Sequence, residues 1–184
     1  MKKFLKWTLI VIGSLIALLF VTFTYLRYQS KIKSPPSTTV YDKSGTKIAV
    51  EYSSPGKRDR EIFGGLVPYG QVWRTGANEA TTFETNKELS IDGKPLPIGK
   101  YTLWTIPEKD KWTVIWNKKQ YSWGVKSPFD RTASREPAED ALQVVVPVEA
   151  LPETLEHFTI SFDDANGLAM ALAWDKTKVV VPIK

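Results

Sequence analysis

The chain contains no cysteine and only one histidine, His157, among its 184 residues. Without cysteine it has no disulfide, no thiolate metal ligand, no cysteine nucleophile and no thiol for lipid attachment. A single imidazole excludes every site that needs two histidines from this chain, including the His-rich zinc sites. The sequence also lacks a phosphate-binding loop, an HExxH pattern, a nucleophile elbow and a calcium-binding loop. We therefore expect no metal site and no cofactor.

Acidic residues are absent from residues 1–33, a segment that holds six basic residues. The whole chain has 25 basic and 20 acidic residues, so residues 34–184 carry 19 basic against 20 acidic residues, a net charge of −1. The positive charge therefore belongs to the N-terminal segment, and the rest of the chain has no electrostatic preference for a phosphate backbone. Because no Lys/Arg stripe interleaved with aromatic residues is present either, we expect no nucleic-acid partner.

Charged residues are also absent from the twenty residues between Trp7 and Leu26, both included. An α-helix of this length is about 30 Å long, which matches the hydrocarbon core of a bilayer. Three lysines precede the run, as at the start of a secretory signal. However, the run is longer than a signal's apolar core of about 7–15 residues, and it does not end in the small residues of a cleavage site. We predict an uncleaved signal anchor over residues 1–27, with the membrane as its partner.

The basic residues on the two sides of this anchor give little indication of its orientation. Three basic residues lie before the span, and Arg27, Lys31 and Lys33 follow it, so the positive-inside rule is almost tied. The signal-like start of the chain favours a cytoplasmic N-terminus. We expect a single-pass protein of the cell membrane, with a polar, proline-containing spacer over residues 28–39 and a domain over residues 40–184 outside the cytoplasm.

Apolar residues alternate with polar ones along several segments of this domain, which is the period of a β-strand. The clearest of these segments are 47–52, 112–116, 158–162 and 168–174. Turn sequences lie at Ser44-Gly45, Asp92-Gly93, Glu108–Asp110 and Asn166-Gly167. The proline-rich residues 94–99 are expected to form a loop, and a short helix is expected within Ala133–Leu142. Many short strands with frequent turns predict an all-β domain, an antiparallel β-sandwich of about eight or nine strands, preceded by one transmembrane helix.

Glycine, aromatic and polar residues are concentrated in the segment Gly64–Thr81, which contains four glycines. Glycine lets the backbone approach a partner closely, and loops on a rigid sheet often carry binding residues. Within this segment Trp73, Arg74, Asn78 and Glu79 are the candidate ligand-binding residues. Arg58 and Arg60, a few residues upstream, either join them or are solvated.

This segment resembles the bacterial family called domain of unknown function 2911, and its most specific part is the block from Trp73 to Glu79. The other matching segments are Val50–Ser53 with Pro55, Arg60–Gly64, Leu96-Pro97, Gly99–Tyr101, Leu103–Pro107, Trp112–Asn117, Trp123-Gly124 and Trp174–Ile183. Members of the family look like exported or membrane-attached β-rich proteins with no assigned activity. The resemblance therefore implies a fold and a candidate surface in the cell envelope, but no reaction.

The sequence departs from the family pattern at a few positions. Asp59 stands where a glycine is expected. Downstream of Trp123-Gly124, Phe129 and Asp140 stand for a tyrosine and an aspartate, and Gln143 takes the place of an arginine. Any role of that arginine in the family is therefore in doubt for this chain.

Several candidates have a structural interpretation beside the functional one. Trp112 and Trp116 share a strand face and are expected to fill the core, as is Trp174. Trp123, in a Tyr-Ser-Trp-Gly loop, is suited either to packing or to stacking on a flat ligand such as a sugar. His157 falls on the polar side of its strand and is expected to be exposed.

We predict a binding module rather than an enzyme, with Trp73, Arg74, Asn78, Glu79 and Trp123 as its site. The ligand would be an envelope glycan, a small polar molecule or an envelope protein; Arg74 and Glu79 would take its polar groups, and Asn78 would fix its orientation. The alternative is a hydrolase acting on glycans or related cell-envelope substrates, with Glu79 as acid or base and a second carboxylate from elsewhere in the chain. In a third hypothesis Arg74 and Glu79 pair to pin their own loop, and function lies in contacts with partner proteins or in self-association.

Overall fold

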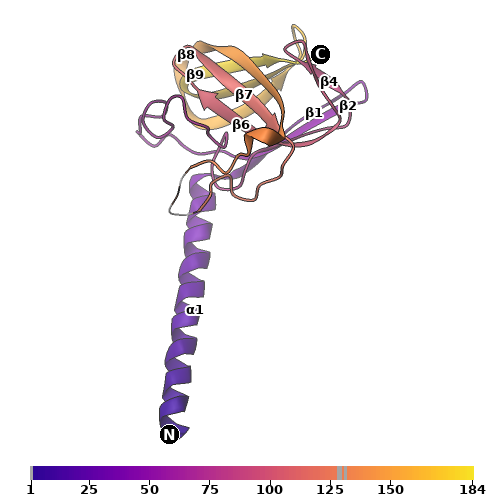
Figure 1. Cartoon of the computed structure of the whole chain (residues 1–184). Helices are drawn as coiled ribbons and strands as arrows, with labels where there is room; N and C mark the ends of the chain where they lie inside the picture. The colour runs from indigo at the N-terminus through magenta and orange to yellow at the C-terminus, as the bar shows by residue number, and fades with distance from the viewer. Residues whose placement is uncertain (1, 128–129, 131) are drawn as a thin grey trace. The chain divides into compact units, whose positions relative to one another are not determined.

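The structure is a computed structural model that describes residues 2–127, 130 and 132–184. Contacts within the chain divide it into two units, Met1–Lys33 and Ser34–Lys184 (Figure 1). The elements are α1 (Lys2–Lys33), β1 (Pro36–Lys43), β2 (Thr46–Ser53), β3 (Thr82–Thr85), β4 (Leu89–Ile91), β5 (Lys94–Leu96), β6 (Gly99–Pro107), β7 (Lys111–Asn117), the 3-10 turn η1 (Pro137–Glu139), β8 (Asp140–Asp163) and β9 (Ala169–Pro182).

The first unit is the helix α1, whose apolar side chains are exposed along its length. Two of its hydroxyl groups are satisfied within the helix, because Thr8 and Thr24 donate to the carbonyl oxygens of Phe4 and Phe20 at 3.0 and 2.8 Å. An 18-residue stretch within Lys3–Lys33 has a mean hydropathy of 2.5, so α1 is long and apolar enough to cross a membrane. A signal sequence near the N-terminus has the same properties.

Residues 28–39, predicted as a polar spacer, have regular structure over most of their length. The helix continues to Lys33 and β1 begins at Pro36, so only Ser34 and Pro35 lie between the two elements. Pro36 is tolerated because it is the first residue of an edge strand, where a backbone N–H is dispensable.

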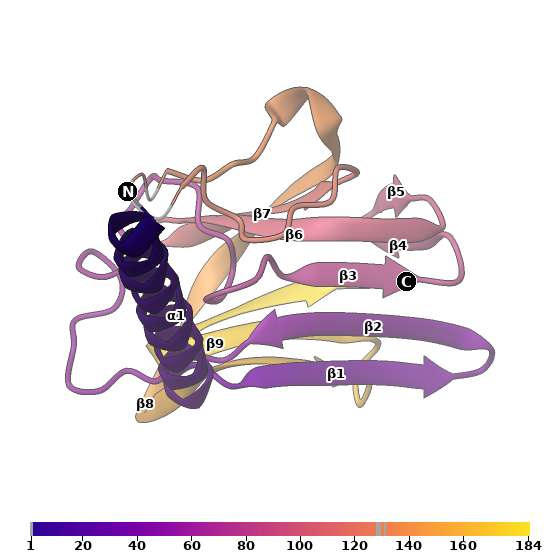
Figure 2. The ribbon, with the colours of Figure 1, turned by 90° about the horizontal axis from the view of Figure 1, so that it is seen from below.

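The second unit contains nine strands within the described residues. Seven of them form one sheet in the order β1-β2-β3-β6-β7-β8-β9, in which every neighbouring pair is antiparallel, and β4 and β5 form a small antiparallel sheet. Figure 2 shows β1, β2, β3, β6 and β7 side by side, with β8 and β9 turning behind them. The prediction of an all-β antiparallel domain of eight or nine strands after an apolar helix is confirmed.

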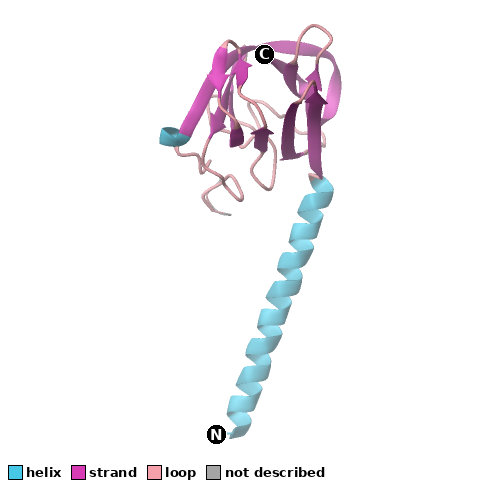
Figure 3. Ribbon diagram, turned by 90° about the vertical axis from the view of Figure 1, so that its right-hand side faces the viewer, coloured by secondary structure: helices cyan, strands magenta, loops and turns pink. Residues whose placement is uncertain are grey.

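The large sheet curls until its first strands meet the distal half of β8. The backbone N–H of Ile160 in β8 donates to the hydroxyl of Tyr52 in β2 at 3.1 Å, and the rings of Tyr41 in β1 and Phe162 in β8 lie 6.2 Å apart. The β8–β9 ladder shifts register on both sides of Leu155, and such irregularities bend a strand. In Figure 3 the strands stand on two sides of the domain, and core side chains fill the space between them.

Large aromatic residues make up much of this core. Trp112, Trp116 and Trp174 are at most 1% exposed, which confirms that they pack as expected. The buried indole N–H groups of Trp104, Trp112 and Trp116 have no hydrogen-bond partner among the described residues. Each such group costs about 1–3 kcal/mol, so the aromatic core is stabilised by the burial of its rings and not by their polar atoms.

The four predicted turns all connect paired antiparallel strands, but two local predictions are wrong. The helix expected within Ala133–Leu142 is reduced to the single 3-10 turn η1, and β8 begins at Asp140. The β-branched run that follows, residues 144–146, favours a strand. Residues 94–96, expected in a loop, form β5, which pairs with β4 across the Asp92-Gly93 turn. Pro95 is accommodated because each strand of a two-stranded sheet has a free edge.

Candidate functional site

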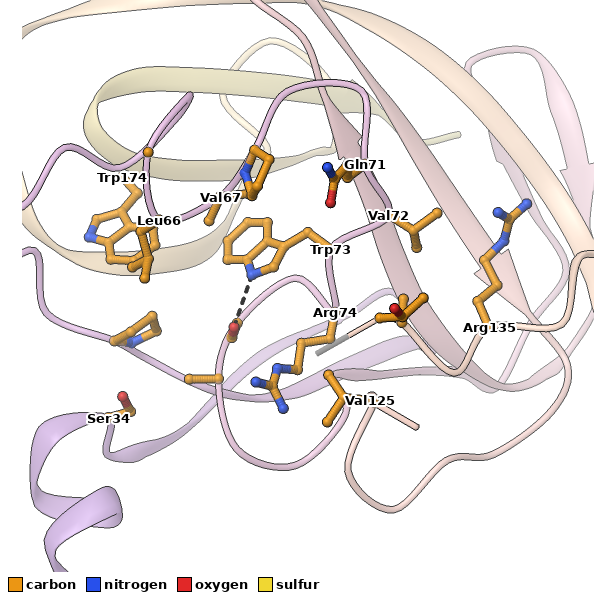
Figure 4. Close-up of a pocket in the computed structure, with 18 of the residues that line it drawn as sticks. Ser34, Leu66, Val67, Gln71, Val72, Trp73, Arg74, Val125, Arg135 and Trp174 are labelled. Atoms are coloured by element: carbon orange, nitrogen blue, oxygen red, sulfur yellow. Dashed lines mark hydrogen bonds between the residues drawn. The ribbon is translucent and has the colours of Figure 1, made fainter. Parts of the chain in front are cut away.

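A cleft of about 990 Å³ opens beside the loop that carries Trp73. Its described lining comes from Ser34, the long connection between β2 and β3, the segment between β7 and β8, and Trp174 of β9. Figure 4 shows Trp73 near the middle of the labelled residues, with Trp174 and Leu66 to one side of it and Arg135 to the other. Residues far apart in the sequence therefore meet at this cleft.

Trp73 is half-buried and connects the cleft to the core. Its backbone N–H donates to the carbonyl oxygen of Thr105 in β6 at 2.7 Å, and its carbonyl accepts from the N–H of Thr105 at 3.0 Å. The indole N–H donates to the carbonyl oxygen of Gly76 at 3.1 Å, the bond dashed in Figure 4. The rings of Phe158 and Trp174 lie 5.0 and 6.0 Å away. The position of the Trp73 ring is therefore fixed by the sheet and by aromatic packing.

The turn after Trp73 has an unusual backbone conformation. Thr75 has a φ of 56° and Asn78 a φ of 55°, in the left-handed region that β-branched residues such as threonine rarely adopt. Thr75 is held there because its hydroxyl donates to that of Thr105 at 3.2 Å and its carbonyl accepts from the hydroxyl of Thr81 at 2.7 Å. Such strain costs about 1–3 kcal/mol and is concentrated at functional sites, which makes this turn a candidate for one.

Arg74 ties this turn to the loop that contains Trp123. Its Nη1 donates to the carbonyl oxygen of Asn78 at 3.0 Å and to that of Trp123 at 2.9 Å. Gly124 has a φ of 72°, and a Cβ at that position would lie 2.9 Å from the Cβ of Arg74. Glycine is therefore required there for the two loops to approach. Arg74 acts as a clamp between the loops and also lines the cleft.

The structure brings two of the five predicted site residues to the described lining of the cleft, Trp73 and Arg74. Asn78 is buried, and its side-chain amide donates to the carbonyl oxygen of Ser34 at 3.2 Å. Glu79 is half-buried outside that lining. Trp123 is 40% exposed and joins the site through its carbonyl group and not through its ring. A ligand-binding role for the five residues stays a prediction.

Three further arginines line the cleft with Arg74, namely Arg58, Arg60 and Arg135, whereas no aspartate or glutamate belongs to its described lining. Arg58 and Arg60 therefore lie at the same cleft as the predicted site. Arg135 was not among the predicted site residues, because nothing in the local sequence indicates that the segment before β8 lies at the same cleft as Trp73.

The loop that carries Arg58 and Arg60 is hydrogen-bonded to the backbone of β8. The N–H of Phe158 donates to the carbonyl of Pro55 at 3.0 Å, and the N–H of Lys57 donates to the carbonyl of Glu156 at 2.7 Å. These two backbone bonds hold the loop on the sheet, so the arginines are presented from a fixed support.

The two guanidinium groups of this loop differ in their contacts. Arg60 donates from Nε and Nη2 to the carbonyl oxygens of Lys57 and Gly56 at 3.0 and 2.6 Å. Burial lowers the pKa of Arg60, the charge of Arg58 lowers it further, and Glu156 acts in the opposite direction. Arg58 is exposed, and its guanidinium has no hydrogen-bond or ion-pair partner among the described residues.

Arg135 forms a buried ion pair with Asp140, with side chains that are 11% and 8% exposed. Asp140 also accepts from the side-chain amides of Asn117 and Gln143 at 2.8 and 2.7 Å. Burial alone would raise the pKa of Asp140, but these hydrogen bonds and the charge of Arg135 outweigh it, so the pKa is lowered. Arg135 thus supplies a guanidinium to Asp140, although Gln143 replaces the arginine of the family pattern. Phe129 lies outside the described residues.

Two carboxylates that were available as partners for Glu79 in a hydrolase, Glu84 and Asp130, and the single histidine do not belong to the described lining of the cleft. Glu84 is exposed on β3 with a carboxylate oxygen 3.8 Å from Nζ of Lys100, and Asp130 is exposed. His157 is exposed, as predicted from its position on the strand. Across residues 2–127, 130 and 132–184, no three acidic or histidine side chains are grouped closely enough to hold a metal ion.

Comparison with known proteins places the second unit in a family. The family model described as "Protein of unknown function (DUF2911)" matches residues 34–183, which is most of the chain and nearly all of the β domain. No curated protein and no solved structure matches the chain. The resemblance seen in the block from Trp73 to Glu79 is therefore confirmed by a match that extends over the whole domain. The chain belongs to the DUF2911 family of proteins of unknown function.

Proposed function

We propose that this protein is a membrane-anchored binding module that holds a small ligand in the cleft beside Trp73, in a domain outside the cytoplasm. The observation that carries the proposal is the cleft itself, which is lined by a half-buried tryptophan and four arginines. Its volume of about 990 Å³ is at the upper end of the range of about 300–1,000 Å³ for ligand pockets. Apolar walls with a few convergent polar groups are the usual composition of such pockets.

The rigidity of the walls supports binding. The segment of Trp73 is bonded to β6, and the loop of Arg58 and Arg60 is bonded to β8. Arg74 joins the turn after Trp73 to the loop of Trp123. A site whose walls are fixed before the ligand arrives loses little conformational entropy on binding, which favours affinity.

Binding accounts for the cleft better than either alternative. A glycan hydrolase of the usual kind needs two carboxyl groups about 5–10 Å apart, and the described lining of the cleft contains none. A purely structural clamp explains the bonds of Arg74 to Asn78 and Trp123, but it does not explain the cleft beside them or the presence of Arg58 and Arg60 there.

The membrane part of the proposal rests on α1. Its length, its hydropathy and the hydroxyl groups bonded within the helix all suit a bilayer span. Because three basic residues lie on each side of the apolar run, the orientation is assigned from the signal-like start of the chain, with the N-terminus in the cytoplasm and the β domain outside it.

Ala77→Tyr is expected to weaken ligand binding, because Ala77 lines the cleft close in the chain to Trp73 and a tyrosine ring there would occupy part of it. The measurement is a thermal-shift screen of the full chain against a library of neutral, anionic and cationic small molecules. A compound at about 100 times its Kd adds about 2.7 kcal/mol of stability, or about 5–10 °C in Tm for a domain of this size.

The matched control is Ala165→Tyr, which places the same ring at an exposed position in the connection between β8 and β9. We expect compounds that stabilise the parent and the Ala165→Tyr variant more than the Ala77→Tyr variant. Compounds that stabilise all three proteins equally, or a library without any stabilising compound, would contradict the proposal.

A further inference from the structure

We infer that the ligand of this cleft is a small anion with an apolar body, a phosphate ester or carboxylate attached to a flat or hydrocarbon group. The inference rests on the proposed binding function and adds the chemical class of the ligand. It is drawn from the charges that line the cleft, from the partners that those charges already have, and from the apolar residues between them.

The charges on the described lining have one sign, since four arginines and no acidic residues belong to it. This excess is local, because residues 34–184 as a whole carry a net charge of −1. A domain that attracted polyanions such as nucleic acids would be basic over a wide surface. The local excess instead fits an anionic group small enough to be enclosed.

Two of the four arginines are committed to other contacts. Arg135 is paired with the carboxylate of Asp140, and Arg74 joins the turn after Trp73 to the loop of Trp123 through the carbonyl oxygens of Asn78 and Trp123. Arg58 has no side-chain partner among the described residues, and Arg60 donates to carbonyl oxygens of its own loop, so these two are the groups we assign to the anion.

The guanidinium groups of Arg58 and Arg60 are both able to bind an anion. The guanidinium of Arg58 has no hydrogen-bond or ion-pair partner among the described residues, and Arg60 donates to carbonyl oxygens, which carry no net charge. A guanidinium presents several donors in a planar fork, which matches the oxygens of a phosphate or carboxylate.

No carboxylate near this loop in the chain or in the fold belongs to the described lining of the cleft, and the same is true of Asp59 and Glu61, which flank Arg60. The side chain of Glu156 accepts the backbone N–H of Arg58 at 2.9 Å, and Asp175 pairs with Lys57 at 2.9 Å. Neither residue belongs to the described lining. The two arginines therefore line a cleft whose described lining holds no carboxylate, and a ligand anion would be their counter-ion there.

The apolar part of the ligand is inferred from the remaining walls. Trp73 is half-buried, and Leu66, which also lines the cleft, is 41% exposed. A tryptophan ring fixed by its packing against Trp174 offers a flat apolar surface for a ring or a chain. Covering Trp73 and Leu66 would add apolar burial to the charge-assisted hydrogen bonds of the arginines.

The test is calorimetric titration of the full chain in phosphatidylcholine nanodiscs with four matched probes. These are 1-naphthyl phosphate, neutral 1-naphthalenemethanol, cationic 1-naphthylmethylamine and inorganic phosphate. We expect 1-naphthyl phosphate to bind at least about tenfold more tightly than each of the other three, because only this probe has both the charge and the ring. Dihexanoyl phosphatidic acid, a soluble lipid with the same phosphate monoester, is titrated in parallel. Tighter binding of this lipid would identify a lipid headgroup as the source of the phosphate, and tighter binding of 1-naphthyl phosphate would identify a soluble ester.

Variants test the assignment of the anion to the arginines. Arg58→Gln is expected to weaken 1-naphthyl phosphate about tenfold, and the Arg58→Gln/Arg60→Gln double variant is expected to weaken it further. The charge-matched control is Lys109→Gln/Lys118→Gln, two exposed lysines outside the described lining of the cleft, with less than about a twofold effect. Arg58→Gln breaks no side-chain hydrogen bond among the described residues, so it separates binding from folding even if the double variant is unstable.

Three results would overturn the inference. Equal affinity for the neutral and the phosphorylated probe, with both weakened in Ala77→Tyr, would show that the cleft binds a ligand without selecting an anion; the binding function would stand and the ligand class would be wrong. Binding of 1-naphthyl phosphate that the lysine control weakens as much as the arginine variants would show a diffuse surface effect. Absence of binding by every probe would also reject the anionic class, and the library screen then decides whether the binding function survives.

Discussion

Asp140→Asn is expected to lower the free energy of unfolding by about 3–5 kcal/mol, because it leaves the buried guanidinium of Arg135 without its counter-charge. The side chains of this pair are 8% and 11% exposed, and Asp140 is also the acceptor for Asn117 and Gln143. The amide of the asparagine carries no charge, and its NH2 group would face donor groups where the carboxylate of Asp140 accepts hydrogen bonds. At about 2–4 °C per kcal/mol, the expected fall in Tm is about 6–20 °C.

The control for this prediction is Glu149→Gln, which breaks an ion pair with Lys178 whose side chains are 52% and 34% exposed. An exposed pair of this kind is worth less than about 1 kcal/mol. Urea denaturation of the full chain in detergent micelles measures both variants. Equal losses in the two variants would show that the pair of Asp140 is as solvated as that of Glu149, which would contradict the account.

The pH dependence of the same pair has a definite sign. The folded-state pKa of Asp140 lies below its ordinary value of 3.8, so its carboxylate stabilises the fold above that value and loses this contribution as the pH falls through the lower pKa. The difference between the parent and the Asp140→Asn variant should therefore be full at neutral pH and shrink under strongly acidic conditions. A difference that grows on acidification would be inconsistent with a lowered pKa.

Leu15→Arg/Leu18→Arg/Leu19→Arg is expected to remove the chain from membranes. These three leucines are 54%, 62% and 68% exposed on α1, where lipid would surround them. Each arginine near the centre of a span costs about 2.5–3.5 kcal/mol, or about 8–10 kcal/mol in total, whereas an apolar residue contributes only about 0.3–0.6 kcal/mol to insertion. The cost therefore exceeds what the remaining apolar residues of the span supply.

The measurement is the fraction of full-length chain that stays with membranes after washing with alkaline carbonate. The parent and the triple alanine variant at the same positions should remain in the membrane fraction, and the triple arginine variant should move to the supernatant. Retention of the arginine variant would mean that α1 does not anchor the protein by spanning the bilayer.

The strands and turns of the domain were predictable because their signals are local. Alternation in segments such as Trp112–Trp116 fixes which side chains face the core, and the Asp92-Gly93 turn fixes a hairpin. The two wrong predictions concern segments whose structure depends on pairing with another strand. Residues 94–96 became β5 because the same turn aligned them with β4, and Asp140 began a strand because β7 was there to pair with it.

The site was predictable only in part, for a similar physical reason. The density of glycine and polar residues around Trp73 and Arg74 is visible in the sequence, and both residues line the cleft. Arg135 reaches the cleft only because the segment before β8 folds back, which no local pattern indicates. Asn78 is a polar residue of the same segment, but its side chain is buried, and its amide donates to the carbonyl oxygen of Ser34 and supports the loop.

The most direct test of the cleft as a binding site is a crystal structure of the full chain with the compound that stabilises it most in the library screen. We expect density for the compound in the cleft, in contact with the ring of Trp73 and within hydrogen-bond distance of the guanidinium of Arg58 or Arg60. Density for the compound on another surface of the domain, with the cleft unchanged, would contradict it.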